Sequence, residues 1–484
     1  MRTVAPLILV ACLIACGDAA PYTKRGVSPA AVSAAAPRVV RVDPAAPARG
    51  RPHEGAPETA AAPVPAEAAT ALEDSAALHR FFDALSQLDE GRLNDDVRIV
   101  QFGDSHTAAD YETGPIRRAL QARFGDGGRG FVQMGKPWKW YTQEGLRRVG
   151  MQGFVAERGK IAHGAFAGDG MYGLSGVSIE ASRRGARAWT ELSLPASRFE
   201  IDYLRQPDGG SVDVLVDGVP FGRVSTRGRT VGSGYQAFDV PEAPHQLEIA
   251  AVGDGKVRVL GVNLERARSG IALDALGING ARIANFLTWS EPHLAEQLHH
   301  RAPALVILAY GTNEAGDDSP IETYERQLVD ALGRVARAVP SASCLLLGPP
   351  DRAHRQVGAP DAPVTWETMP RLLEVVAAQR RVAAAAGCAF YDQLGAMGGP
   401  GSIATWALEA EPRAMADRVH LSREGYAVLG RQFARDVVAA YSAYRADHLA
   451  PPVLEPPPVP LPPLPSPAPV DPDEPIARGS FPSL

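Results

Sequence analysis

Two blocks of the chain alternate short apolar runs with longer segments whose apolar residues recur at helical spacing. In the first block, residues 72–88 have the helical spacing, and residues 97–102 form an apolar run that is typical of a buried strand. The second block continues the alternation through five segments, at residues 305–309, 324–338, 344–347, 369–386 and 388–391. Alternation of this kind predicts an α/β domain whose parallel sheet is covered by helices on both faces.

The stretch between the two blocks has a different pattern, in which apolar and polar residues alternate one by one. Its four clearest segments are separated by turn residues and lie at residues 198–203, 211–218, 245–249 and 256–260. Short alternating segments are typical of the strands of an antiparallel β-sandwich. We therefore expect an inserted antiparallel β-sandwich at residues 161–268, with residues 71–160 and 269–447 forming the two parts of the α/β domain.

The first sixteen residues have the features of a targeting segment. Arg2 precedes an apolar stretch, residues 4–14, that is too short to span a bilayer. The stretch leads into Ala15-Cys16, which resembles the lipobox of bacterial lipoproteins, where the cysteine becomes the first mature residue and is lipidated. We expect residues 1–16 to be a lipoprotein signal peptide, with lipidation at Cys16 attaching the protein stably to a membrane. An ordinary signal peptide with an incidental cysteine is the alternative.

Both ends of the remaining chain have the composition of unstructured segments. Residues 17–70 are rich in alanine and proline and have no hydrophobic periodicity, so they are expected to form a disordered tether. Residues 448–484 are rich in proline, which favours an extended polyproline II conformation in a disordered tail. A passive spacer or a docking site for a partner are both compatible with such a tail.

Charge and cysteine content narrow the classes of function. The net charge of −6 and the 21% of charged residues exclude the basic footprint of a nucleic-acid-binding protein. We expect no cofactor and no metal, because His299-His300 has no acidic or cysteine companion at ligand spacing. Cys344 and Cys388 each open an apolar run, so they could pair at one end of the sheet in an exported protein or stay free in the core.

A serine lies where the strand at residues 97–102 turns into a helix, in the stretch Gly103-Asp104-Ser105. In this position the hydroxyl of Ser105 is exposed at the carboxyl end of the strand. The backbone N–H groups and the dipole of the following helix can stabilise negative charge there. A serine is a weak nucleophile at its own pKa and needs an adjacent base.

The remaining parts of a serine hydrolase site follow later in the chain. His420 is a suitable base and Asp417, three residues earlier, could orient its ring from the same loop. A tetrahedral oxyanion needs hydrogen-bond donors, and the backbone N–H groups of Ser105 and Gly280 and the amide of Asn313 could supply them.

These residues resemble the conserved blocks of the SGNH/GDSL hydrolase superfamily, in that family's order. The four blocks correspond to Gly103-Asp104-Ser105, Gly280, Asn313, and Asp417 with His420. The resemblance covers most of residues 95–445 apart from the insertion, and it implies a flavodoxin-like three-layer α/β domain. It also implies that Ser105, Asp417 and His420 are catalytic and that Ser105, Gly280 and Asn313 form the oxyanion hole.

Within that superfamily, the sequence from Gly103 to Ala108 and the long β insertion resemble the peptidoglycan O-acetylesterases, which remove acetyl groups from muramic-acid sugars. His106 replaces the common leucine, as is typical of that group, and is expected to support the site or line its groove. Glu314 stands where the family usually has Asp, which should not remove the donor on Asn313.

The resemblance implies a serine esterase that removes O-acetyl groups from a cell-wall or surface polysaccharide. An acetylated glycan would then be the substrate, outside the cytoplasm of a bacterium and at the membrane that holds the lipid anchor. Three alternatives stay open: a glycan O-acetyltransferase with the same triad, a hydrolase of lipid or aryl esters, and a non-catalytic wall-binding lipoprotein. Trp138, Trp140 and Tyr141 could form a platform for sugar rings, or could equally pack under a loop.

Overall fold

The computed structural model describes residues 70–162, 165–356 and 364–448. The predicted signal peptide with Cys16, the predicted linker up to residue 69 and the predicted tail after residue 448 lie outside the described residues. Within the described part, no helix has both the length and the apolar character needed to cross a membrane.

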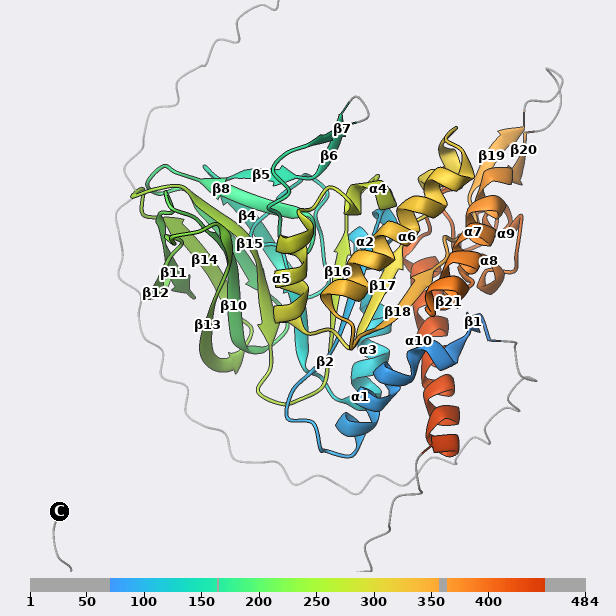
Figure 1. The fold of residues 1–484 in the computed structure, drawn as a ribbon, viewed down its shortest axis with the longest axis horizontal. Helices are drawn as coiled ribbons and strands as arrows, with labels where there is room; N and C mark the ends of the chain where they lie inside the picture. Colours follow the sequence, from blue (N-terminus) through green and yellow to red (C-terminus); the bar gives the residue numbers. More distant parts are fainter. Residues whose placement is uncertain (1–69, 163–164, 357–363, 449–484) are drawn as a thin grey trace, which may run out of the picture. The chain divides into compact units, whose positions relative to one another are not determined.

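A six-stranded sheet forms the centre of the α/β domain (Figure 1). Its strands stand in the order β1-β21-β18-β17-β2-β16, and only β1 is antiparallel to its neighbour. The strands are β1 (Leu72–Glu73), β2 (Val97–Gly103), β16 (Ile271–Gly277), β17 (Leu305–Ala309), β18 (Ser343–Leu347) and β21 (Ala389–Tyr391). The predicted parallel sheet is therefore present, and it takes strands from both sides of the insertion.

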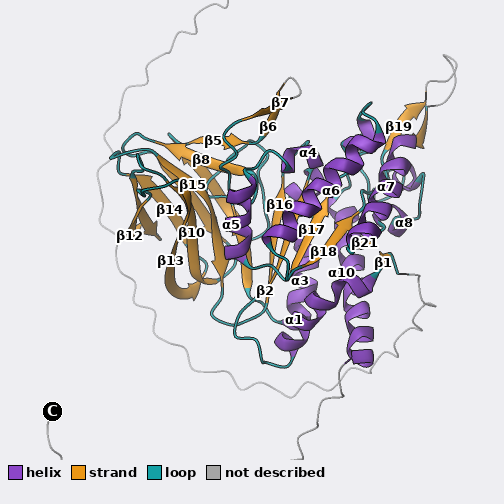
Figure 2. Ribbon diagram, viewed as in Figure 1, coloured by secondary structure: helices purple, strands orange, loops and turns teal. Residues whose placement is uncertain are grey.

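Helices cover both faces of this sheet and make three layers (Figure 2). One face packs against α1 (His79–Asp89), α3 (Thr113–Phe124) and α10 (Arg423–His448). The other face packs against α4 (Ile283–Phe286), α5 (Glu291–Arg301), α6 (Ile321–Ala338) and α7 (Pro370–Ala386). Short helices complete the domain: η1 (Ser75–Leu78), α2 (Ser105–Ala108), η2 (Glu314–Gly316), α8 (Gln393–Ala396) and α9 (Ser402–Trp406).

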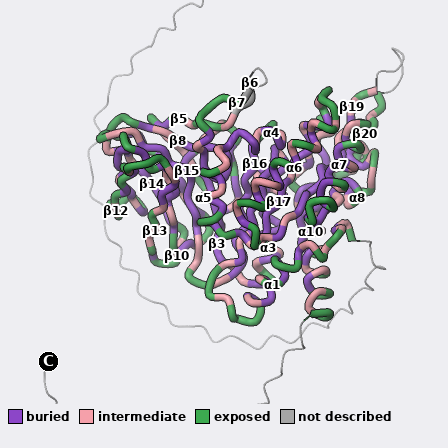
Figure 3. Tube along the Cα trace, viewed as in Figure 1, coloured by how far each residue is buried: buried purple, intermediate pink, exposed green. Residues whose placement is uncertain are grey.

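Strand β2 shows how the sequence produces this layering. Val97 and Ile99 point into the cluster of α1, α3 and α10, whereas Val100 and Phe102 point into the cluster on the opposite face. Successive side chains of a strand point to opposite faces, so a strand covered on both faces needs apolar residues at both sets of positions. This is why residues 97–102 form an apolar run and not an alternating pattern, and Figure 3 shows the buried positions through the domain interior.

Two antiparallel sheets form the second part of the structure. One has the order β13-β10-β15-β8-β5, with β3 also paired to β15, and the other has the order β12-β11-β14-β9-β4. Buried residues of both sheets, among them Ile201 and Val259 in the first and Val214 and Ile249 in the second, form one hydrophobic cluster. The strands are β3 (Gly128–Val132), β4 (Leu146–Gln152), β5 (Val155–Arg158), β8 (Val177–Ala181), β9 (Arg187–Leu192), β10 (Ala196–Arg205), β11 (Ser211–Val216), β12 (Val219–Ser225), β13 (Gly232–Ala243), β14 (Gln246–Ala251) and β15 (Val257–Glu265). Two separate hairpins, β6 (Lys160–Ala162) with β7 (Ala165–Ala167) and β19 (Ala353–Gln356) with β20 (Thr365–Thr368), complete the strands.

Strands β3, β4 and β5 belong to these antiparallel sheets although they precede residue 161. Strand β3 is glycine-rich and buried at every position, and β4 has no buried residue. Neither strand has the regular alternation of buried and exposed residues on which the sequence pattern depends.

A buried ion pair joins the antiparallel part to the α/β sheet. Asp274 of β16 accepts a hydrogen bond from the backbone N–H of Phe131 in β3 at 2.7 Å. Arg301 of α5 donates to both carboxylate oxygens of Asp274, at 2.7 and 2.9 Å, and reaches Glu265 of β15 at 2.9 Å. Burial alone would raise the pKa of Asp274, but the Arg301 guanidinium outweighs it and the pKa is lowered.

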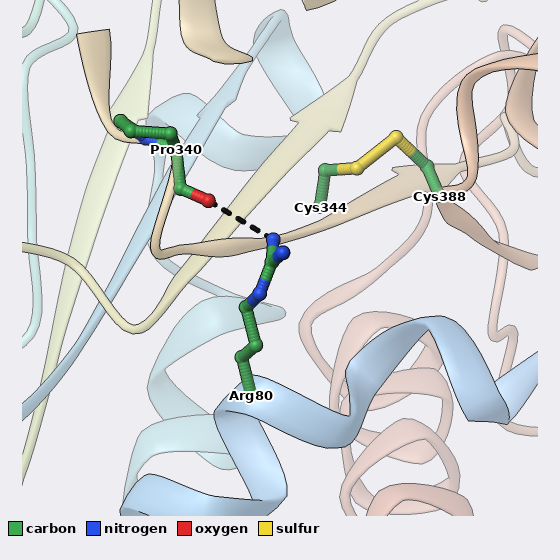
Figure 4. Close-up of a disulfide and its surroundings, with 4 residues drawn as sticks. All are labelled: Arg80, Pro340, Cys344 and Cys388. Carbon is green, nitrogen blue, oxygen red and sulfur yellow. Dashed lines mark hydrogen bonds between the residues drawn. A yellow bond between two sulfur atoms is a disulfide. The ribbon is translucent and has the colours of Figure 1, made fainter.

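A disulfide joins Cys344 to Cys388, with 4.9 Å between the Cα atoms (Figure 4). Cys344 lies in β18 and Cys388 immediately precedes β21, and these two strands are parallel neighbours. The pair therefore lies at the amino ends of the strands. Nearby, Arg80 donates a hydrogen bond to the carbonyl of Pro340 at 2.9 Å, as Figure 4 shows.

Candidate active site

Three neighbouring strands bring the predicted site residues to one edge of the sheet. β2 lies between β16 and β17, and its last residue, Gly103, pairs with Gly277 on one side and Ala309 on the other. The carboxyl ends of the three strands are therefore level. The segments that follow them carry Ser105, Gly280 and Asn313.

The turn that presents Ser105 is closely packed. Asp104 caps the following helix α2, because its carboxylate accepts a hydrogen bond from the backbone N–H of His106 at 2.9 Å. A Cβ atom on Gly103 would lie 2.3 Å from the hydroxyl of Thr107 and 2.9 Å from the carbonyl oxygen of Ala309. Only glycine leaves room for this approach, so the packing fixes both the glycine and the position of the serine.

The predicted triad is assembled in hydrogen-bonding contact. Oγ of Ser105 lies 3.0 Å from Nε2 of His420, and Nδ1 of His420 lies 2.7 Å from Oδ2 of Asp417. The other oxygen of Asp417 accepts hydrogen bonds from the backbone N–H groups of Val419 and His420, both at 3.0 Å. Arg418 has a φ of 56°, which lets the loop turn tightly enough for one carboxylate to make all three contacts.

The surroundings of the triad favour an ionised aspartate. Burial opposes ionisation of Asp417, but the hydrogen bonds from His420 and from the backbone outweigh it and lower the pKa of Asp417. The side chains of His420 and Asp417 are still 37% and 47% exposed. A large substrate can therefore reach the triad from solvent.

The two other predicted oxyanion donors lie in loops that contact each other. Gly280 has a φ of 76°, and its N–H group donates no hydrogen bond to any residue that the structure describes. The amide of Asn313 donates to the carbonyl of Ala281 at 2.9 Å and to Asp104 at 3.3 Å. The amide of Asn313 therefore connects the loop after Gly280 to Asp104, the residue before Ser105.

Glu314 ties the same two loops together. Its carboxylate accepts hydrogen bonds from the backbone N–H of Ile283 at 2.7 Å and of Gly311 at 3.1 Å. Burial raises the pKa of Glu314 to about 7, although the hydrogen bond from Ile283 opposes this shift. Glu314, which stands where the family usually has Asp, thus ties the loop that carries Asn313 to the segment after Gly280.

His106, which follows Ser105, is buried behind the triad. Its ring lies 5.5 Å from the ring of His420, and its Nδ1 lies 2.9 Å from the hydroxyl of Tyr426. Burial, helped by the nearby His420, lowers the pKa of His106 to about 3, so the ring is neutral. Tyr426 was not identified from the sequence. Its position six residues after His420, on the helix that follows that histidine, was the only available signal.

The three aromatic residues proposed as a sugar platform do not share one surface. Tyr141 is buried, its hydroxyl accepts a hydrogen bond from the backbone N–H of Gln133, and its ring packs edge-on against Trp138 at 5.0 Å. Trp140 is 71% exposed, with the ammonium of Lys139 4.7 Å from its ring centre. Within the described ranges, no group of three or more His, Cys, Asp or Glu side chains is arranged to hold a metal ion.

Comparison with known proteins gives a family match and a structural match that informs function. A model of the GDSL-like Lipase/Acylhydrolase family matches residues 246–428, which include every predicted site residue except Ser105 and Cys16. A solved peptidoglycan O-acetylesterase is 27% identical with a TM-score of 0.63, and the match covers 77% of this chain and 99% of that chain. No curated protein sequence matches the chain.

Two carbohydrate esterases of family two are also similar, with TM-scores too low to inform function. The enzyme from Clostridium thermocellum, solved with cellohexaose, has a TM-score of 0.24 and 10% identity, over 55% of this chain and 95% of that chain. The enzyme from Cellvibrio japonicus has a TM-score of 0.25 and 12% identity, over 64% of this chain and 98% of that chain.

The family match and the solved structure agree with each other and with the arrangement of strand ends described above. Together they support an SGNH/GDSL serine hydrolase: residues 246–428 match the GDSL-like Lipase/Acylhydrolase family, and the chain is similar to a solved peptidoglycan O-acetylesterase.

Proposed function

We propose that this chain is an esterase that removes O-acetyl groups from a cell-wall polysaccharide, with O-acetylated peptidoglycan as its substrate. The observation that carries this proposal is the contact of 3.0 Å between Ser105 Oγ and His420 Nε2, continued to Asp417 at 2.7 Å. This is the hydrogen-bonded chain that activates a serine for attack on an ester carbonyl. The choice of acetyl and of peptidoglycan is supported by the similar esterase of known structure.

The proposed reaction follows from the positions of the three side chains. Ser105 attacks the acetyl carbonyl while His420 takes the serine proton, and the ionised Asp417 stabilises the imidazolium that forms. His420 then gives the proton to the sugar oxygen, which leaves as a hydroxyl. Water attacks the acetyl-enzyme in the same way, with His420 again as the base, and acetate is released.

Charge on the tetrahedral intermediate would be stabilised at the carboxyl ends of the strands. The N–H of Ser105 belongs to the first turn of α2, where N–H groups have no partner within the helix. The unbonded N–H of Gly280 and the amide of Asn313 would complete the hole. Asn313 reaches the oxyanion by exchanging its long contact of 3.3 Å with Asp104 for a shorter one.

We propose further that the protein works outside the cytoplasm, held to a membrane by a lipid on Cys16, and that its two antiparallel sheets form an inserted β-sandwich. The disulfide between Cys344 and Cys388 supports an oxidising compartment. The hydrophobic cluster common to both sheets supports the sandwich.

The test is acetate release from O-acetylated peptidoglycan by the full chain, compared with Ser105→Ala. Release that disappears in the variant would support the esterase. Cleavage of p-nitrophenyl acetate without release from peptidoglycan would keep the triad and reject the substrate. Acetyl transfer to an added acceptor sugar in place of free acetate would identify a transferase, and inactivity on both substrates would favour a wall-binding protein.

A further inference from the structure

Two neighbouring hollows lie between the start of α10 and the antiparallel sheets. The first, of about 500 Å³, lies between the segment after α2, residues 142–146 and the start of α10. The second, of about 460 Å³, lies between residues 142–149 and Trp189 of β9. Thr142 and Leu146 line both hollows, so the two are neighbours, and we treat them together as one groove. Each half has a volume typical of a ligand site, about 300–1,000 Å³.

The first hollow begins close to the catalytic histidine. Arg423, which lines it, is three residues after His420 and is the first residue of α10. The guanidinium of Arg423 lies 4.7 Å from the ring centre of Tyr111 and donates to the hydroxyl of Tyr111 at 3.1 Å. The Tyr111 ring packs on Tyr426, which contacts His106 behind the triad. The first hollow is therefore linked to the triad through Tyr111, Tyr426 and His106, and the second hollow lies at β4 and β9 of the antiparallel sheets.

Six basic side chains line the groove, and together they define what we call the basic groove: Arg118, Lys136, Arg147, Arg148, Arg423 and Arg431. This concentration is local, because the chain as a whole has a net charge of −6.

The acidic side chains near the basic groove are too few to neutralise it. Asp110, which also lines the first hollow, is buried and already pairs with Arg117 and Arg129. Arg118 pairs with Glu144 and Arg431 pairs with Glu424 at 2.7 Å. Arg147 and Arg148 both approach the single carboxylate of Glu191, at 3.5 and 3.6 Å. Among the residues that the structure describes, Arg423 and Lys136 form no ion pair with an acidic side chain. The groove therefore has an excess of positive charge.

We propose that the basic groove binds the carboxylates of peptides attached to the glycan strand, so that the enzyme prefers peptidoglycan that still carries its peptides. This inference rests on the proposed function. A glycan strand with its acetyl group at Ser105 extends past the active site as a polymer, and the exposed triad permits this. Charged side groups on that strand would meet Arg423 near the triad and the two arginines of β4 at the far end. Guanidinium groups bind carboxylates with paired hydrogen bonds.

The test uses the far end of the groove, at a distance from the triad. Arg147 and Arg148 are 68% and 77% exposed, so a double change to Gln should not disturb the fold. The matched control is Arg337→Gln with Arg381→Gln, two arginines 63% and 62% exposed on α6 and α7, outside the groove. Each protein is assayed on peptide-bearing O-acetylated peptidoglycan, on the same material after an amidase has removed the peptides, and on p-nitrophenyl acetate.

We expect the ratio of kcat/KM on peptide-bearing peptidoglycan to kcat/KM on p-nitrophenyl acetate to fall about fivefold in the groove variant, as two exposed charge contacts would give. The control variant should keep the ratio of the unchanged protein. Amidase treatment removes the peptide carboxylates and leaves one carboxylate on the lactyl group of each sugar that carried a peptide, so on that material the fall in the groove variant should be clearly smaller. A ratio that does not fall, or a fall of the same size after amidase treatment, would overturn the proposal.

A binding measurement separates this proposal from the proposed function. Ser105→Ala, with and without the two groove changes, is sedimented with insoluble peptidoglycan at increasing salt. Binding that weakens with the groove changes and with salt, from a protein whose unchanged form releases no acetate, would keep the groove and reject the esterase. Acetate release by the unchanged protein, together with binding that changes neither with the groove substitutions nor with salt, would support the esterase and reject the groove.

Discussion

The hydroxyl of Tyr426 lies 2.9 Å from Nδ1 of His106, so a residue of α10 holds the side chain next to Ser105 in sequence. Helix α10 begins three residues after His420. Helix α10 therefore holds His106 directly, and the loop that carries the proposed base leads into the same helix; the two histidine rings lie 5.5 Å apart. A neutral His106 adds bulk at this position without adding a second charge beside His420.

Removing the hydroxyl tests the positioning role of this pair. We expect Tyr426→Phe to leave a buried nitrogen of His106 without its partner and to lower the free energy of unfolding by about 1–2 kcal/mol. Turnover should fall while KM on p-nitrophenyl acetate stays the same, because Tyr426 acts through His106 and not on the substrate. Urea unfolding and steady-state kinetics measure the two effects.

The other side of this hydrogen bond is tested with His106→Leu, which introduces the residue common in the wider family. Because both variants remove the same hydrogen bond, the double variant should lose less stability than the sum of the single losses, with a coupling of about 0.5–1.5 kcal/mol. Strict additivity of the two losses would show that the pair does not act as a unit.

The amide of Asn313 gives a second prediction. Replacement by alanine should lower kcat on p-nitrophenyl acetate by on the order of 10²–10³, the usual loss for one oxyanion donor. The matched control is Asn279→Ala, an exposed asparagine beside Gly280, for which we expect a change of less than about twofold, the ordinary result at an exposed position. Unchanged turnover in Asn313→Ala would exclude its amide from the mechanism.

The sequence predicted the parallel sheet, and Ser105 and Asn313 follow the apolar runs predicted as strands at residues 97–102 and 305–309. Gly280 was placed through the resemblance to the family, because the strand before it was not predicted. In the structure those strands are adjacent, which a single sequence does not reveal but which brings the three segments together. The loop of Asp417 and His420 was found from its spacing alone. The hydrogen bonds to the Asp417 carboxylate are local, from residues no more than three apart, whereas Ser105 and the backbone N–H of Ala353, which donates to the carbonyl of Arg418 at 3.0 Å, reach the loop from distant segments.

What the sequence did not reveal depends on contacts between distant segments. Tyr426 reaches His106 across 320 residues, and Gln393 reaches Glu112 across 281. Strand β3 was not predicted from the sequence, because it is buried at every position and therefore has no alternating pattern. The basic groove combines residues from α3, α10 and β4, so no local charge cluster marks it.

Glu112 is a buried acid that should make stability depend on pH. Burial raises its pKa to about 8, although the amide of Gln393 donates to it and opposes the shift. An unfolded chain releases this proton near pH 4.3. Between these values the folded state holds a proton that the unfolded state has lost, so stability falls as pH rises from about 4 to 8.

Glu112→Gln removes that titration and keeps an acceptor for Gln393. We expect the variant to be more stable than the unchanged protein at pH 8.5 by about 1–3 kcal/mol, with the difference decreasing towards pH 5. Urea midpoints at a series of pH values measure it, and Glu322→Gln, an exposed acid on α6, is the control. A difference that does not depend on pH would show that Glu112 is ionised in the folded protein.

The disulfide should stabilise the protein without serving the reaction. Cys344 and Cys388 are 44 residues apart, and closing a loop of this length stabilises the folded state by about 4 kcal/mol in the chain-entropy model, with 2–4 kcal/mol typical of measured cases. We expect the double alanine variant to lose a few kcal/mol of unfolding free energy. Its folded form should keep full kcat, because the bond lies at the amino ends of the strands and the triad at their carboxyl ends. Adding dithiothreitol should move the urea midpoint of the unchanged protein towards that of the variant and leave the variant where it is. A large loss of kcat at urea concentrations where the variant is fully folded would contradict this separation of stability from catalysis.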